Sequence, residues 1–222
     1  MEFALLFFIE LLFLFFCSKL VIKSLAQIFY NLTRSNKGTI YLLAATFLPG
    51  TIIHELAHAI TAGVLLVHVG GVEVMPEIQE GGVKLGTAQI GQTDPVRRAL
   101  IGLAPVLVGL LIILGTLFFF VSSFKDGSLP FWAYPVIVYS LFEISNTMFS
   151  SRKDLEGIGV FLVIILSILA GLYLVGIHQP FGWIGNLLGS SAHFFKLASL
   201  LLFIPIGIDL ATYGLAKLLL KR

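Results

Sequence analysis

The chain has 222 residues, of which 58% are hydrophobic and 12% are charged. Ordinary soluble domains contain about 25% charged residues. With a mean hydropathy of +1.00, this chain has more apolar surface than one soluble core could bury. A water-soluble globule is therefore excluded, and we expect an α-helical integral membrane protein. The net charge of +2, from Lys and Arg scattered along the chain, also argues against a nucleic-acid partner.

Six apolar segments have about the 20 residues that a transmembrane helix needs. They cover residues 3–30, 39–66, 96–121, 131–149, 155–176 and 195–217. The first could be a signal peptide, but Glu2 stands where a cationic region belongs and no small-residue cleavage site follows, so we expect a retained helix. Glycines and aromatic residues in 177–194 suit an interfacial loop or a short surface helix. We expect one membrane domain over residues 1–222, multi-pass, in the cytoplasmic (cell) membrane.

Residues 68–92, between the second and third segments, lose the helical periodicity. Apolar residues there alternate with polar or small ones on both sides of Glu80-Gly81-Gly82, which is typical of a β-hairpin. Because an open strand edge cannot lie bare in hydrocarbon, we expect the hairpin at the interface or around a wet cavity. Asp94 and Pro95 follow it, and they predict the N-cap and the first residue of the third helix. We therefore give Asp94 a structural role.

The most informative stretch lies in the second segment and reads His54-Glu55-Leu56-Ala57-His58. Residues four apart project from one face of a helix, so both imidazoles can bind one zinc ion with Glu55 beside it. Zinc hydrolases keep one coordination position for water, whose pKa falls to about 7 on the metal, and a neighbouring glutamate accepts its proton. The pattern predicts zinc-dependent hydrolysis of amide bonds. A non-catalytic metal site is the alternative.

Four features within residues 40–160 occur together. They are the motif from His54 to His58 inside an apolar span, the hairpin that follows it, the Gly102-Leu103-Ala104-Pro105 stretch in the next span, and Asn146 eight residues before Asp154. With these features the chain resembles the site-2 protease family of intramembrane zinc metalloproteases. The resemblance implies that Asp154 is the third ligand of a single zinc ion. It also implies that Asn146 holds the substrate or the developing oxyanion near the metal.

Other acids compete with Asp154 for the third zinc position. Members of the family show an N-x-x-P-x-x-P-x-D-G segment, whereas this chain has Phe149 and Arg152 in place of the prolines and Gly157 three residues after Asp154. Asp154 also suits the N-cap of the helix predicted after it. Glu143 shares a helix face with Asn146 and is the second choice, as a zinc ligand or as part of a water pathway. Glu156 and Asp209 follow in that order.

These predictions combine into a zinc-dependent endopeptidase that cuts transmembrane segments of other membrane proteins. A helical substrate must unwind before its carbonyl can reach the metal, and an unpaired strand edge from residues 83–90 would receive the extended segment. Glu55 would act as general base and then as general acid, with Asn146 stabilising the intermediate. The competing class is a non-proteolytic metal-binding transporter or scaffold. A transporter commonly has symmetrical halves, and no second half here mirrors the region around His54.

Overall fold

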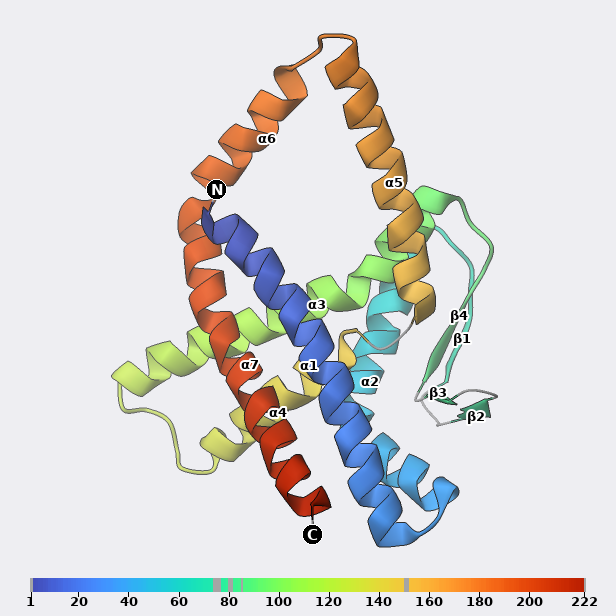
Figure 1. Cartoon of the computed structure of the whole chain (residues 1–222), viewed down its shortest axis with the longest axis vertical. Helices are drawn as coiled ribbons and strands as arrows, with labels where there is room; N and C mark the ends of the chain where they lie inside the picture. The colour runs from blue at the N-terminus through green and yellow to red at the C-terminus, as the bar shows by residue number, and fades with distance from the viewer. Residues whose placement is uncertain (1, 74–76, 80–81, 85, 150–151, 222) are drawn as a thin grey trace.

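The computed structural model describes residues 2–73, 77–79, 82–84, 86–149 and 152–221, with the backbone alone at 77–79, 82–84, 87, 152–158 and 160–162. Within these residues the chain forms seven helices and four short strands. The helices are α1 (Glu2–Thr33), α2 (Asn36–Val64), α3 (Pro95–Lys125), α4 (Ala133–Thr147), α5 (Arg152–Leu174), α6 (Gln179–Ser190) and α7 (Ala192–Leu220). Figure 1 shows α1, α2, α3, α4 and α7 grouped together, with α5 and α6 forming an arch beyond them.

Four of the described helices, α1, α2, α3 and α7, are long and apolar enough to cross a membrane. This agrees with the expected helical membrane protein. The expected six spans are not confirmed. Helix α4 has 15 residues, which give about 22 Å at 1.5 Å per residue, against about 30 Å of hydrocarbon. In α5 the described apolar stretch is limited to Val163–Leu174. Residues 177–194 contain the short helix α6, which was one of the two structures predicted there.

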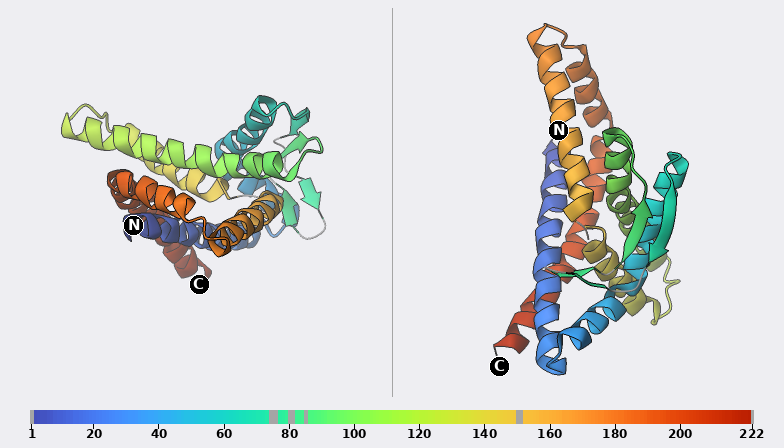
Figure 2. Two further views of the ribbon diagram at one scale, coloured as in Figure 1. Left: turned by 90° about the horizontal axis from the view of Figure 1, so that it is seen from above. Right: turned by 90° about the vertical axis from the view of Figure 1, so that its right-hand side faces the viewer.

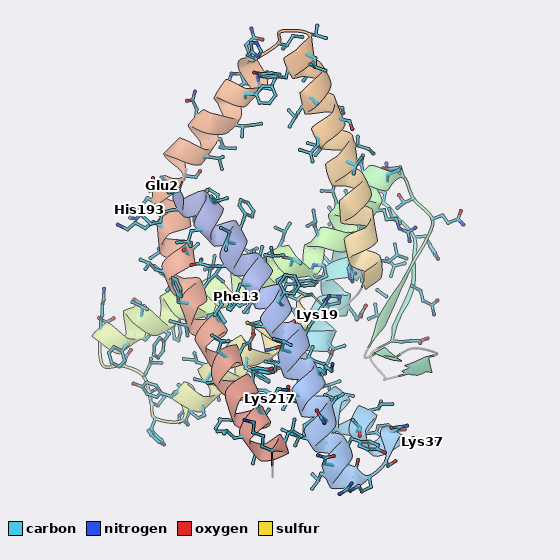
Figure 3. All side chains as sticks on the ribbon, viewed as in Figure 1. Glu2, Phe13, Lys19, Lys37, His193 and Lys217 are labelled. Atoms are coloured by element: carbon cyan, nitrogen blue, oxygen red, sulfur yellow. The ribbon has the colours of Figure 1, made fainter. Side chains whose placement is uncertain are left out.

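Helices α1 and α7 lie side by side and run in the same direction. The rings of Phe7 and Phe195 are 5.6 Å apart, and one turn further along, Ser199 donates to the Glu10 carboxylate at 2.8 Å. In Figure 3 the labelled Glu2 and His193 mark the neighbouring starts of the two helices. Six complete crossings in alternating directions would make the first and last helices antiparallel. The two helices are instead parallel.

The predicted hairpin is present and forms two short antiparallel sheets. Strand β1 (Val69–Glu73) pairs with β4 (Thr87–Ile90), and nearer the tip β2 (Glu77–Gln79) pairs with β3 (Gly82–Lys84). At the base, the Gly91 N–H donates to the His68 carbonyl at 2.9 Å. Side chains of β1 and β4 pack on a small core formed by Ala62, Val67 and Ile101. Figure 2 shows the hairpin lying along α2, on the outside of the bundle.

The main core joins α1, α3, α4 and α7. Each of these helices contributes a leucine or isoleucine that is at most 2% exposed: Leu14, Ile113, Leu141 and Leu202. None of the described side chains of α5 and α6 belongs to this core, and those of α6 are all exposed or half-buried. The bundle thus holds α4 between α2 on one side and α7 on the other, and this arrangement positions the polar residues described below.

The start of α3 confirms the role predicted for Asp94. Its Oδ1 accepts hydrogen bonds from the backbone N–H groups of Val96 at 3.1 Å and Arg97 at 3.0 Å, and Pro95 occupies the first turn. The hydrogen bond from the Arg97 N–H, followed by the nearby Arg97 guanidinium, lowers the pKa of the Asp94 carboxyl. The cap fixes where α3 begins, and hence where its next turns meet α2.

Candidate metal centre

The three residues of the zinc motif lie together on α2 and are buried. The side chains of His54, Glu55 and His58 are 4%, 7% and 5% exposed. The Nε2 atoms of His54 and His58 are 3.2 Å apart, and the two rings are nearly perpendicular, with centroids separated by 4.8 Å. The helix therefore brings two imidazole nitrogens to one point, as the four-residue spacing predicts.

The separation of these nitrogens fits a shared zinc ion. Zinc binds histidine nitrogen at about 2.0–2.1 Å in a tetrahedral arrangement, so two such ligands are about 3.3–3.4 Å apart. The observed distance of 3.2 Å is close to this value. His54 and His58 are thus suited to hold zinc with little rearrangement.

The ring of His58 is oriented by α3. Its Nδ1 lies 2.8 Å from the Ile101 carbonyl oxygen, and because a carbonyl can only accept, the proton must be on Nδ1. The lone pair of His58 is then on Nε2, the atom that faces His54. Ile101 can serve as this acceptor because Pro105, four residues later in α3, has no N–H to donate to it. A proline in the third helix therefore sets the tautomer of a histidine in the second.

The hairpin reaches the carboxylate of the motif. Gly86, between β3 and β4, is buried against α2, where a Cβ on it would lie 2.8 Å from Thr51 Cγ2, 3.0 Å from Glu55 Cγ and 3.1 Å from Glu55 Oε1. Glycine is thus the residue that allows this close approach. The hairpin backbone forms one wall beside Glu55.

Glu143 lies on α4 and contacts α2 one helical turn before His54. Its Oε1 accepts a hydrogen bond from the Gly50 N–H at 2.8 Å, and its side chain is 3% exposed. Across the described residues, no three His, Cys, Asp or Glu side chains are grouped so that they could hold a metal. The second-choice ligand is therefore not placed with the histidine pair in this structure.

The acid implied as third ligand, Asp154, lies in the first turn of α5. Its side chain falls outside the described residues, as does that of Glu156. The identity of the third ligand therefore stays a prediction.

Asn146 is directed at α7. Its Nδ2 donates to Asp209 Oδ1 at 2.7 Å and to the Phe142 carbonyl at 2.8 Å, and Ser145 Oγ lies 3.5 Å from the same Asp209 oxygen. Asn146 is 1% exposed and Asp209 is fully buried. Among the described residues, Asn146 Oδ1 and Asp209 Oδ2 have no hydrogen-bond partner. The amide nitrogen predicted to act on the substrate thus links α4 to α7.

Three features of the site were not found from the sequence. They are the acceptance of the His58 proton by Ile101, the contact of Gly86 with Glu55, and the hydrogen bond between Gly50 and Glu143. One signal was available, because a proline at position 105 leaves the carbonyl four residues before it without a helical donor. The other two join elements that are distant in sequence.

Comparison with models of protein families finds no match, and comparisons with curated proteins and with solved structures find none either. The functional conclusion therefore depends on the chemistry of the chain's own residues.

Proposed function

We propose that this chain is a zinc-dependent endopeptidase that cleaves transmembrane segments of other membrane proteins. The main support is the pair of imidazole nitrogens 3.2 Å apart on an apolar, membrane-length helix. Two histidines and a glutamate buried in such a helix are costly to insert and therefore indicate a functional site. Glu55 beside them supplies the carboxylate that a zinc hydrolase requires.

In this proposal His54, His58 and Asp154 hold the metal. Zinc, when bound, makes a water molecule acidic enough to lose a proton near neutral pH. Glu55 would accept a proton from the attacking water and pass it to the leaving amide nitrogen. His58 keeps its Nε2 lone pair available because its other nitrogen donates to Ile101. In the described structure the Asn146 amide is bound to Asp209, so a direct role in stabilising the intermediate would require this contact to open.

The substrate would bind in extended form along the hairpin. Strand β4 pairs with β1 on one side, and Gly86, the residue before β4, lies against Glu55. A peptide added to the other edge of β4 would run past the carboxylate. Main-chain hydrogen bonds would supply affinity and hold the segment unwound. This keeps the predicted edge of residues 83–90 as the substrate site.

We further propose a multi-pass protein of the cell membrane in which α1, α2, α3, α5 and α7 make five crossings. The parallel arrangement of α1 and α7 supports an odd number. Helix α5 has 23 residues, or about 34 Å, which is sufficient to cross. Helix α4, shorter than the hydrocarbon thickness, would then sit within the bundle without crossing on its own.

The test is Glu55→Gln with a model transmembrane substrate in detergent or vesicles. Glutamine keeps the size of the side chain but cannot take the proton, so the variant should bind zinc like the wild type and cleave nothing. A Gln variant that still cuts would refute the mechanism. Zinc content of Asp154→Ala and Glu143→Gln assigns the third ligand: glutamine keeps an acceptor for the Gly50 N–H but removes the carboxylate, so loss in the second alone would move the ligand to Glu143. A non-proteolytic metal protein would bind zinc and cut no substrate in either form.

A further inference from the structure

The α2 helix contains a proline at position 49, one turn before the zinc motif. A proline inside a helix clashes with the carbonyl four residues earlier and disturbs the adjacent hydrogen bonds. Inside a membrane there is no water to bind the released groups, so another part of the protein must do so. Backbone groups around Pro49 therefore need hydrogen-bond partners from outside α2.

Helix α4 binds both members of one hydrogen-bonded pair at this turn. In a regular α-helix the Gly50 N–H would donate to the Thr46 carbonyl. Here the Gly50 N–H donates to Glu143 Oε1 at 2.8 Å, and the Thr46 carbonyl accepts from the Tyr139 hydroxyl at 2.9 Å. Tyr139 and Glu143 are one turn apart on α4, as Thr46 and Gly50 are on α2. Successive turns of the two helices therefore contact each other.

At Gly50 the backbone of α2 and the side chains of α4 also approach each other closely. A Cβ on Gly50 would lie 3.0 Å from Thr147 Cγ2 and 3.2 Å from Glu143 Cγ. Glycine at position 50 thus lets α4 approach the α2 backbone, and Glu143 is 3% exposed at the contact. Polar and small residues at such a contact hold membrane helices together.

This contact lies on the stripe of α2 that carries the zinc ligands. Gly50, His54 and His58 are spaced four residues apart and follow one face. The stripe is fixed to α4 at Gly50 and to α3 at His58 through Ile101. His54 lies between these two anchors, one turn from each.

We propose that Tyr139 and Glu143 are positioning residues for the zinc motif. By binding the Thr46 carbonyl and the Gly50 N–H, they fix the rotation of the turn that presents His54 to His58. The proposal rests on the zinc-binding part of the proposed function. Glu143 acts as a hydrogen-bond acceptor in this role, and its negative charge is not required.

Three variants test the proposal. Glu143→Gln keeps a side-chain oxygen for the Gly50 N–H, Glu143→Ala removes it, and Tyr139→Phe removes only the hydroxyl. Tyr134→Phe is the matched control, because Tyr134 is on the same helix and its ring packs on Phe120. The measurements are hydrogen–deuterium exchange of the peptide covering residues 46–58 in metal-free protein and zinc affinity by competition with a chelator.

We expect at least tenfold faster exchange in residues 46–58, and at least tenfold weaker zinc binding, for Glu143→Ala and Tyr139→Phe. Glu143→Gln and Tyr134→Phe should stay within about twofold of the wild type. Loss of zinc in Glu143→Gln equal to that in Glu143→Ala would overturn the proposal, because the charge would then be needed. Wild-type exchange or wild-type zinc affinity in Tyr139→Phe would overturn it as well.

These readouts separate this proposal from the proposed function. If Glu143→Ala fails to fold, the comparison of Tyr139→Phe with Tyr134→Phe still decides the outcome. A wild-type protein that binds zinc but cleaves no substrate would refute the protease while leaving the positioning role intact. Exchange measured without metal reports on the α2–α4 contact even if zinc does not bind.

Discussion

The Nδ1 of His58 donates to the carbonyl oxygen of Ile101 at 2.8 Å. This hydrogen bond joins the zinc motif on α2 to the backbone of α3, and it depends on Pro105, which leaves that carbonyl without its usual helical donor. Outer partners of this kind fix the ring orientation and the tautomer of a metal-binding histidine. Pro105 thus affects the orientation of the His58 ring indirectly, through the Ile101 carbonyl.

Pro105→Ala restores an N–H that competes for the Ile101 carbonyl, so His58 should lose part of its orienting hydrogen bond. We expect zinc affinity to fall by about tenfold or more, the range seen when such outer partners are removed. The measurement is a chelator competition with purified protein. Pro205→Ala is the control, since Pro205 is a buried proline within the membrane helix α7. Equal affinities for the wild type and Pro105→Ala would show that the proline has no such role.

Gly86→Ala places a methyl group 2.8 Å from Thr51 Cγ2 and 3.0 Å from Glu55 Cγ. We expect the hairpin to shift away from α2, and cleavage of a model substrate to fall at least tenfold while the zinc content stays at the wild-type level. Gly71→Ala is the matched control, because Gly71 lies on β1 of the same hairpin and a Cβ there meets nothing within 4 Å. Wild-type cleavage by Gly86→Ala would contradict the close contact between the hairpin and Glu55.

Asp209→Ala removes the acceptor for the Asn146 amide in a fully buried position. A buried group left unsatisfied costs about 1–3 kcal/mol, so the variant should unfold more easily in a thermal or denaturant titration. Asp209→Asn keeps the size and an acceptor oxygen and places no charge in the apolar interior of the bundle, and we expect it to be at least as stable as the wild type. Asp126→Asn, at the exposed end of α3, serves as control. Equal destabilisation by Ala and Asn would mean that the carboxylate charge itself stabilises the bundle.

Asp94→Ala should lower the thermal midpoint at pH 7, because two backbone N–H groups at the start of α3 lose their acceptor. The pKa of Asp94 is lower in the folded protein than its ordinary value. Its stabilisation is therefore complete above the unfolded-state pKa of about 3.9 and is lost as the pH falls through the folded-state value. The gap between the wild type and Asp94→Ala should therefore narrow as the pH of the melts falls below the ordinary aspartate pKa. A gap independent of pH would show that the charge does not contribute.

Much of the fold follows from local sequence. The apolar runs place the long helices, since about 20 apolar residues are stable across a bilayer as a helix, and Asp94-Pro95 places the start of α3 because capping involves neighbouring residues alone. The hairpin is predicted because the apolar residues in 68–92 lose the helical spacing and alternate with polar or small ones. The contact between His54 and His58 is also predicted locally, because residues four apart lie on one face of a helix.

The contacts between distant segments could not be predicted in this way. Glu143 meets Gly50 and Asn146 meets Asp209 because of how α4 lies between α2 and α7. Periodicity indicates that α4 has a polar face, but it does not say which helix receives each side chain. The expected six crossings are not confirmed for a related reason: the apolar residues of α4 predict a span, but in the structure this helix has 15 residues and packs inside the bundle.

Zinc stoichiometry of the purified, folded protein decides whether His54 and His58 bind a metal ion. The wild type and Glu55→Gln should each bind one zinc ion per chain, and His58→Ala should bind none while keeping the helical circular-dichroism spectrum of the wild type. A folded wild-type protein that contains no metal and takes up no added zinc would contradict the account.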